Sequence, residues 1–217
     1  MSDTAAARLN MVDGQIRTNN VTDPDIVDAM ASVPREMFVP KQLRGVAYID
    51  DDIKIAADRY LMEPLVLARM LQAAKTEPQD VVLDLGCGTG YSAAVLARLA
   101  AAVVALENDP GLASDATENL TELQADNVAV VTGKLPEGYP EQGPYDVVVI
   151  NGAIEQVPPV IAEQASDGGR IVAVVDDGGI GRATLFTKQG DQLSGRVLFE
   201  AAVPPLPGFG KKRGFVF

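Results

Sequence analysis

Residues 84–90, Asp-Leu-Gly-Cys-Gly-Thr-Gly, are the segment of the chain whose types and spacing are most suited to chemistry. They follow a short apolar run at 81–85 and precede a helical pattern that begins at Tyr91. Glycines allow a backbone to turn sharply and to approach a ligand without obstruction by Cβ atoms. Glu107 ends the next apolar run about twenty residues later, where a carboxylate can accept hydrogen bonds from both hydroxyls of a ribose. Together these features predict a nucleoside site.

The glycine spacing distinguishes two kinds of nucleoside cofactor. A dinucleotide fingerprint reads Gly-x-Gly-x-x-Gly, but its third glycine would fall at Tyr91, and Gly90 comes one position early. The spacing therefore favours S-adenosylmethionine, and the carboxylate of Asp84 can help to hold the cationic amino group of its methionine portion. Two other interpretations stay open: a tight strand-to-helix turn without a ligand, and a nicotinamide-dependent reductase that uses Glu107 to hold ribose.

The candidate cofactor-binding residues follow the ends of three predicted strands. They are Asp84, Gly86, Cys87, Gly88, Thr89, Gly90, Glu107, Asn108 and Asn151. Cys87 has no histidine to activate it, so we expect a small packing residue of the loop and not a nucleophile. Asn151 begins an Asn-Gly pair that fits an ordinary turn as well as a substrate contact.

The chain contains no histidine, and this absence restricts its chemistry more than any other feature of the composition. It excludes Ser-His hydrolase chemistry, histidine metal sites and the usual near-neutral general base, so we predict no metal. The net charge of −12 repels polyanions, and we expect no nucleic-acid partner. The dense basic cluster at 211–213, Lys-Lys-Arg, is typical of a solvated tail.

Length and hydropathy favour one domain that folds in water. A chain of 217 residues can form one α/β domain with a sizeable core. No apolar run approaches the roughly 20 residues that cross a bilayer, and residues 1–4 lack the features of a secretion signal. A single cysteine agrees with a reducing compartment. We therefore expect a cytoplasmic protein without a membrane partner, and the sequence favours no particular oligomeric state.

The first part of the domain, residues 1–75, is predicted to be a helical cap. Residues 3–31 show a helical pattern, within which Thr22 supplies a capping hydroxyl before Pro24. Residues 48–55 are expected to be extended or irregular, and a further helix is expected at 63–74. Because these elements precede any parallel sheet, we expect them to lie over its edge or its mouth.

The second part, residues 78–217, is predicted to be the α/β core. Short apolar runs alternate there with helical stretches, which is typical of βαβ units and a parallel sheet. A turn at 167–169 is expected before the fifth strand, and the last two strands should form an antiparallel hairpin. The predicted strands are 81–85, 102–107, 128–131, 147–150, 171–175, 183–188 and 193–200, and the predicted helices are 91–100, 112–123 and 158–165.

Three segments of the chain resemble a known family. Met-Val-Asp-Gly-Gln-Ile-Arg at 11–17, Val-Pro-Arg-Glu-Met-Phe-Val-Pro at 33–40 and the glycine loop together are similar to protein-L-isoaspartate O-methyltransferases. The resemblance implies a Rossmann-like, doubly wound sheet of seven strands, as in class I S-adenosylmethionine-dependent methyltransferases. It also implies an isoaspartyl carboxylate of a protein or peptide, or a small carboxylate, as the methyl acceptor. Because such an acid has a pKa of about 4, it is ionised at neutral pH and needs no general base.

The segment 60–64 departs from the family's active-site pattern, Thr-Ile-Ser-Gln-Pro. Met62 stands in place of the serine, which removes a hydroxyl, and Glu63 stands in place of the glutamine, which adds a negative charge. An anionic acceptor would be repelled there unless Arg59 or another cation compensates. Arg59 and Tyr60 fit either the mouth of an active site or ordinary packing of a surface loop.

A second departure follows the third predicted strand. Gly133-Lys134 stands in place of a Gly-Asp pair that meets the adenine amino group in the family, and a lysine side chain cannot accept a hydrogen bond. By resemblance, Gly133 and Lys134 complete the candidate cofactor site. The two departures leave open a divergent paralogue that binds the cofactor but methylates another acceptor or has a non-catalytic, regulatory role.

Overall fold

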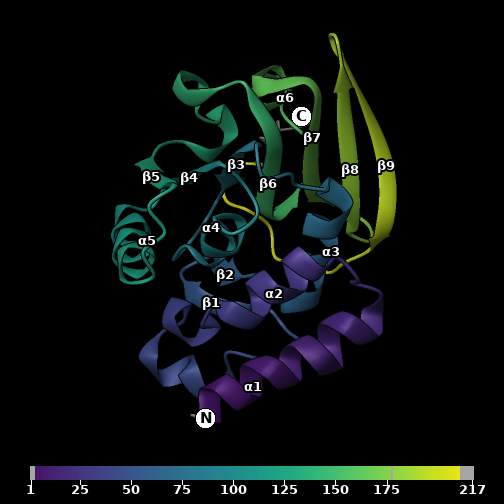
Figure 1. Ribbon diagram of the computed structural model, residues 1–217. Helices are drawn as coiled ribbons and strands as arrows, with labels where there is room; N and C mark the ends of the chain where they lie inside the picture. Colours follow the sequence, from purple (N-terminus) through teal and green to yellow (C-terminus); the bar gives the residue numbers. More distant parts are fainter. Residues whose placement is uncertain (1–2, 177, 211–217) are drawn as a thin grey trace, which may run out of the picture.

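The computed structural model describes residues 3–176 and 178–210, and a seven-stranded sheet forms its centre (Figure 1). The strands lie in the order β5-β4-β3-β6-β7-β8-β9, with β3 to β7 parallel and β8 and β9 antiparallel. They are β3 (Val81–Leu85), β4 (Ala102–Glu107), β5 (Val128–Thr132), β6 (Tyr145–Ile154), β7 (Ala165–Val175), β8 (Arg182–Gln189) and β9 (Gln192–Glu200). The doubly wound, mostly parallel sheet and its closing hairpin are confirmed.

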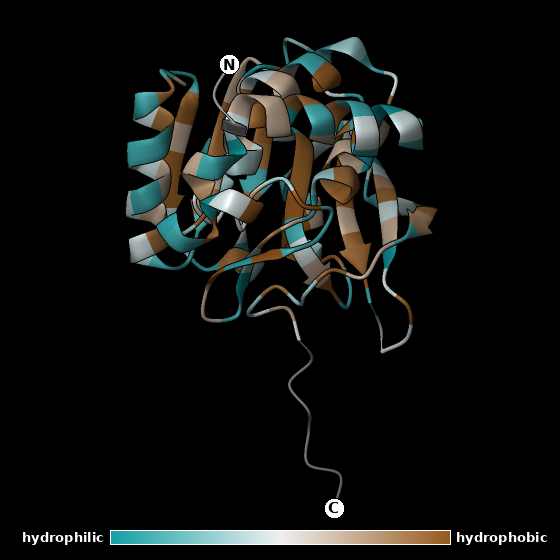
Figure 2. Ribbon diagram, turned by 90° about the horizontal axis from the view of Figure 1, so that it is seen from below, coloured by the Kyte–Doolittle hydropathy of each residue, from teal (hydrophilic) through white to brown (hydrophobic). Residues whose placement is uncertain are grey.

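Alternate residues of the central strands face two separate hydrophobic cores. Val82 and Leu83 of β3, for example, belong to opposite cores. The first core is covered by α3 (Pro64–Ala74), α4 (Tyr91–Leu96) and α5 (Pro110–Glu122), and the second by α6 (Pro159–Gln164) and the chain near Leu206. Figure 2 shows hydrophobic strands between helices whose outer faces carry hydrophilic residues. Helices on both faces explain why the parallel strands read as continuous apolar runs.

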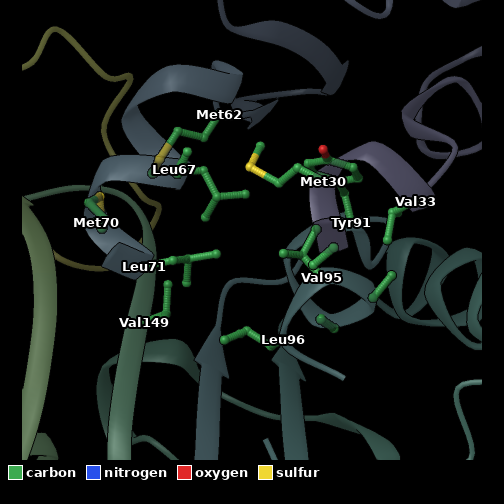
Figure 3. Close-up of a cluster of buried hydrophobic side chains, with 14 of the residues drawn as sticks. Met30, Val33, Met62, Leu67, Met70, Leu71, Tyr91, Val95, Leu96 and Val149 are labelled. Carbon is green, nitrogen blue, oxygen red and sulfur yellow. The ribbon is translucent and has the colours of Figure 1, made fainter. Parts of the chain in front are cut away.

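The N-terminal elements form a further layer against the first core. Met30 and Val33, at the end of α2 (Pro24–Ser32), face Tyr91 and Val95 of α4 (Figure 3). α1 (Asp3–Met11) precedes them, and a small antiparallel hairpin of β1 (Ile53–Ala56) and β2 (Arg59–Leu61) follows.

These N-terminal elements form a cap that covers the mouth of the sheet. The sequence left open whether the cap lies over the mouth or over the edge. The hydroxyl of Thr89, in the loop after β3, donates to the carbonyl of Phe38 at 2.6 Å. Arg59 of β2 likewise donates to the carbonyl of Gly86 at 3.0 Å. The cap is therefore bonded to the carboxyl ends of the strands.

The helical region predicted at 3–31 divides into two helices. α1 passes into a π-helical turn (Val12–Ile16) and a 3-10 turn (Arg17–Asn19), and Asn20 ends it in a left-handed conformation with φ of 64°. The prediction that Thr22 caps the second helix is wrong. The carboxylate of Asp23 caps α2 instead, because it lies one residue before Pro24 and accepts from the two N–H groups that follow, at 3.0 and 3.4 Å.

Other element boundaries differ from the predictions at turns. The expected turn at 167–169 lies inside β7, because β6 and β7 pair from Tyr145 and Ala165 onward through an irregular register. α4 ends at Leu96, four residues before its predicted end, and the chain continues to Ala100 as turns. Within the described ranges, no helix is long and apolar enough to cross a membrane. The basic cluster at 211–213 lies outside the described residues.

We expect Asp23→Ala to lower the free energy of unfolding by about 1 kcal/mol, because it removes both capping bonds of α2. Asp28→Ala, on the exposed face of the same helix, is the matched control and should change stability by less than about 0.5 kcal/mol. Urea denaturation measures both effects. Equal stabilities of the two variants would contradict the capping role.

Candidate active site

The parallel register of the sheet brings three predicted site residues, Asp84, Glu107 and Asn151, to the edge at the carboxyl ends of the strands. The strand order reverses between β3 and β6, which is the switch point where doubly wound sheets bind ligands. Asn151 Nδ2 donates to one carboxylate oxygen of Asp84 at 2.7 Å, and the Ser92 hydroxyl donates to the other at 2.7 Å. Burial raises the pKa of Asp84 to about 6, and these two hydrogen bonds oppose that rise. The sequence did not identify Ser92, although its place in the first turn of the next helix was a usable signal.

The glycine loop has the conformation that its sequence predicts. Gly86, Gly88 and Gly90 all have positive φ angles, of 76°, 58° and 97°. A Cβ atom at Gly90 would lie 3.2 Å from Cβ of Ala116 in α5, so this glycine also permits close packing of two helices. Any other residue at these three positions would therefore strain the backbone, and at Gly90 its Cβ atom would also be crowded by Ala116.

Glu107 ends β4 with its side chain fully buried. One carboxylate oxygen accepts from the N–H of Gly88 at 2.8 Å. The other accepts from the N–H groups of Asn108 and Asp109, at 2.8 and 3.1 Å. This oxygen also pairs with the guanidinium of Arg59, which is only 4% exposed. Glu107 thus lies where the sequence predicts a ribose-binding carboxylate, already paired with a cation.

Arg59, which the sequence left between the mouth of an active site and ordinary loop packing, lies in the site, but its pairing with Glu107 was not predicted. Its Nη1 atom also donates to Asn108 Oδ1 at 3.1 Å, and its Nη2 atom donates to the carbonyl of Gly86 at 3.0 Å. The positive charge of Arg59, directly before segment 60–64, was a local signal of a site residue. Its contact with Glu107 has no local signal, because the two residues are 48 positions apart.

The chain after β9 returns to the same place, as the yellow segment of Figure 1 shows. Ala153 of β6 donates to the carbonyl of Pro204 at 2.9 Å and accepts from the N–H of Leu206 at 2.8 Å. The side chain of Leu206 fills the space beside Gly86 and Gly152, where added Cβ atoms would lie 2.9 Å from it. The two cavities around Met62 and Asn151 therefore hold only about 10 Å³ each.

Met62 lines both cavities, and Glu63 follows it in the connection between β2 and α3. Met62 is 5% exposed and packs next to Leu67 in the first core (Figure 3). The Glu63 N–H donates to Asp52 Oδ1 at 2.9 Å. Burial, followed by the charges of neighbouring aspartates, raises the pKa of Glu63 to about 7, and burial raises that of Asp52 to about 6. Both carboxyls therefore bind protons more tightly than usual.

Arg35 fixes the backbone of the loop that contains Met62. Its guanidinium is completely buried, donates from Nη2 to the carbonyl of Met62 at 2.8 Å and from Nε to that of Ala47 at 2.8 Å. It also lies over the ring of Tyr91, 4.7 Å from the centroid. Burial lowers the pKa of Arg35. These contacts fix the backbone of the segment that the sequence singled out.

The remaining predicted residues divide between the site and the surface. The Gly133 N–H donates to the carbonyl of Glu107 at 3.0 Å, so this backbone lies beside the site. Lys134 points away from the site, because its side chain is 78% exposed and its amine pairs with Glu137 at 2.8 Å. Cys87 is buried, and burial raises the pKa of its thiol, in keeping with a packing role.

Proteins of known family match the chain over most of its length. A family model described as protein-L-isoaspartate(D-aspartate) O-methyltransferase matches residues 7–206. A protein-L-isoaspartate O-methyltransferase of Koribacter versatilis is 36% identical over 204 residues, which cover 94% of this chain and 92% of the relative. One of Methanoregula boonei is 40% identical over 168 residues, 77% of each chain.

Solved structures agree with this match. One described as a protein-L-isoaspartate O-methyltransferase has a TM-score of 0.81 and 27% identity, over 93% of this chain and 66% of that one. A Plasmodium falciparum protein described in the same way, in complex with S-adenosyl-L-homocysteine, has the same fold, with a TM-score of 0.79 at 17% identity, over 95% and 99% of the two chains. The fold and its glycine loop define a class I S-adenosylmethionine-dependent methyltransferase. The chain belongs to the protein-L-isoaspartate(D-aspartate) O-methyltransferase family.

Glu63→Gln should stabilise the protein at pH 8 but not at pH 4. The folded-state pKa of Glu63 is about 7, above its ordinary value of 4.5, so ionisation opposes folding. This cost is absent below pH 4.5, grows as the pH rises and is complete above pH 7. We expect a gain of about 1 kcal/mol at pH 8, since solvent partly screens the group.

Chemical denaturation at both pH values measures this difference. Glu122→Gln, at the exposed end of α5, makes the same change of charge and is the control. A gain for Glu63→Gln that was equal at pH 4 and pH 8 would refute the assigned cause.

Proposed function

We propose that this protein transfers the methyl group of S-adenosylmethionine to an isoaspartyl carboxylate of damaged protein. The observation that carries the proposal is the convergence of Asp84, the glycine loop and Glu107 at the switch point of the sheet, in a chain of this family. A repair reaction of this kind yields a methyl ester and S-adenosylhomocysteine.

The residues present fit the proposed cofactor. Glu107 offers a buried carboxylate to the ribose hydroxyls, Asp84 offers another to the amino group, and the loop between them lacks Cβ atoms at three positions. When bound, the cofactor supplies an electrophilic methyl group on a cationic sulfur. Asp84, with its pKa of about 6, is mostly ionised at neutral pH, and a neighbouring cation would lower that pKa further. For adenine, we propose the backbone at Gly133, since the Lys134 amine is paired at the surface.

The chemistry suits a chain without histidine. An ionised carboxylate attacks a methyl group without losing a proton, so the protein needs only to align the reacting atoms and to exclude water. Met62 is buried beside the site and contributes apolar surface there. Glu63, with its pKa of about 7, carries only part of a negative charge at neutral pH, which reduces its repulsion of an anionic acceptor. We therefore propose a divergent family member in which Met62 stands where relatives carry serine.

A second candidate function is a paralogue that binds the cofactor but does not methylate isoaspartyl groups. The observation that favours it is the group of acidic residues near Met62, in which burial, followed by the charges of Asp52, Asp50 and Asp51, raises the pKa of Glu63. A neutral or cationic acceptor, or a regulatory role, would suit such surroundings better.

A methyl-transfer assay distinguishes the two functions. We expect purified protein to methylate an isoaspartyl peptide and to leave the isomeric aspartyl peptide unmodified. Saturable binding of S-adenosylhomocysteine without transfer to either peptide would favour the second candidate. Absence of both binding and transfer would reject both.

Met62→Ser should raise kcat/KM for the isoaspartyl peptide about tenfold, because a hydroxyl that can position the acceptor is worth about 1.4 kcal/mol. Met62→Ala is the matched control, since it creates similar space without a hydroxyl. A rise shared equally by both variants would mean that space, and not the hydroxyl, limits the reaction.

A further inference from the structure

We propose that Arg59 binds the acceptor carboxylate, and that cofactor binding releases it from Glu107 for this purpose. The inference rests on the proposed function and deepens it. It assigns a substrate-binding residue within segment 59–63 and an order of binding in which the cofactor comes first.

The first step is competition for one carboxylate. Glu107 is completely buried, and its oxygens are already approached by three backbone N–H groups and by Arg59. Ribose hydroxyls that bind this carboxylate must take the place of the guanidinium, because the backbone donors are fixed: Gly88 donates from the glycine loop, and Asn108 and Asp109 donate from the turn after β4. The volume of the site also implies that side chains must move when the cofactor binds. The cavities of about 10 Å³ are far below the ~300–1,000 Å³ of ligand pockets.

The second step concerns the displaced cation. A buried guanidinium that loses its carboxylate partner is strongly unfavourable unless another anion pairs with it. Arg59 lines the same small cavity as Met62 and Asn151, so it is already at the proposed place of reaction. Among the described residues that line this cavity, Arg59 is the one cation, whereas Asp52 and Asp58 are anions.

Two further cations among the described residues lie near this loop. Lys54 is exposed on β1, with its amine 5.9 Å from the centroid of the Tyr60 ring. Arg35, the other buried arginine near Met62, lies under the backbone and is held by two carbonyls and the ring of Tyr91. An isoaspartyl carboxylate that enters the cavity beside Asp52 and Met62 therefore has Arg59 as its buried counter-ion. While Arg59 is paired with Glu107, the acceptor lacks this partner, so the cofactor must bind before the acceptor.

Arg59→Gln tests the competition through cofactor affinity alone. Calorimetric titration with S-adenosylhomocysteine should show binding about tenfold tighter than in the unmodified protein, because no ion pair must be broken. Arg170→Gln is the matched control, since it breaks the partly buried pair with Asp80 at the start of β3, 2.7 Å in length, and should leave this affinity unchanged. Equal or weaker binding by Arg59→Gln would overturn the proposal.

The acceptor role has a separate readout. Arg59→Gln should raise KM for the isoaspartyl peptide at least tenfold, with a smaller change in kcat, and Arg59→Lys should restore part of the loss. In the unmodified protein, the peptide should bind in calorimetry only when S-adenosylhomocysteine is present. An unchanged KM, or equal peptide binding with and without that ligand, would overturn the acceptor role.

These outcomes are distinguishable from failure of the proposed function. If the unmodified protein transferred no methyl group, the proposed function would fail. The comparison of S-adenosylhomocysteine affinities would still decide whether Arg59 competes for Glu107.

Discussion

The buried carboxylate of Glu107 is the group on which the arrangement of the site depends. A buried charge is tolerated only where it is paired and hydrogen-bonded. Gly88 binds it from the glycine loop, Asn108 and Asp109 bind it from the turn before α5, and Arg59 binds it from the cap. One carboxylate therefore joins the sheet, the loop and the cap, and its position at the end of β4 fixes where all three meet.

Segment 60–64, directly after Arg59, combines a fixed backbone with unusual ionisation. Arg35 fixes its backbone at Met62. Asp52 and Glu63 are partly neutral near pH 7, since burial raises their pKa values to about 6 and 7. Acceptor preference therefore depends on the local chemistry of this loop and not on the fold.

The sequence predicted those parts of the site that depend on local structure. The glycine loop, Asp84 and Glu107 follow from apolar periodicity and from the rule that parallel strands end at one edge. The contact of Arg59 with Glu107 and that of Leu206 with Gly86 could not be predicted, because they join segments distant in the chain through side-chain packing without periodicity.

A crystal structure with bound S-adenosylhomocysteine tests the central claim most directly. In that structure we expect both ribose hydroxyls to donate to the carboxylate of Glu107, the guanidinium of Arg59 to have left this carboxylate, and Leu206 to have moved away from Gly86. A ligand whose sugar lies elsewhere, with Arg59 still paired to Glu107, would contradict the central claim.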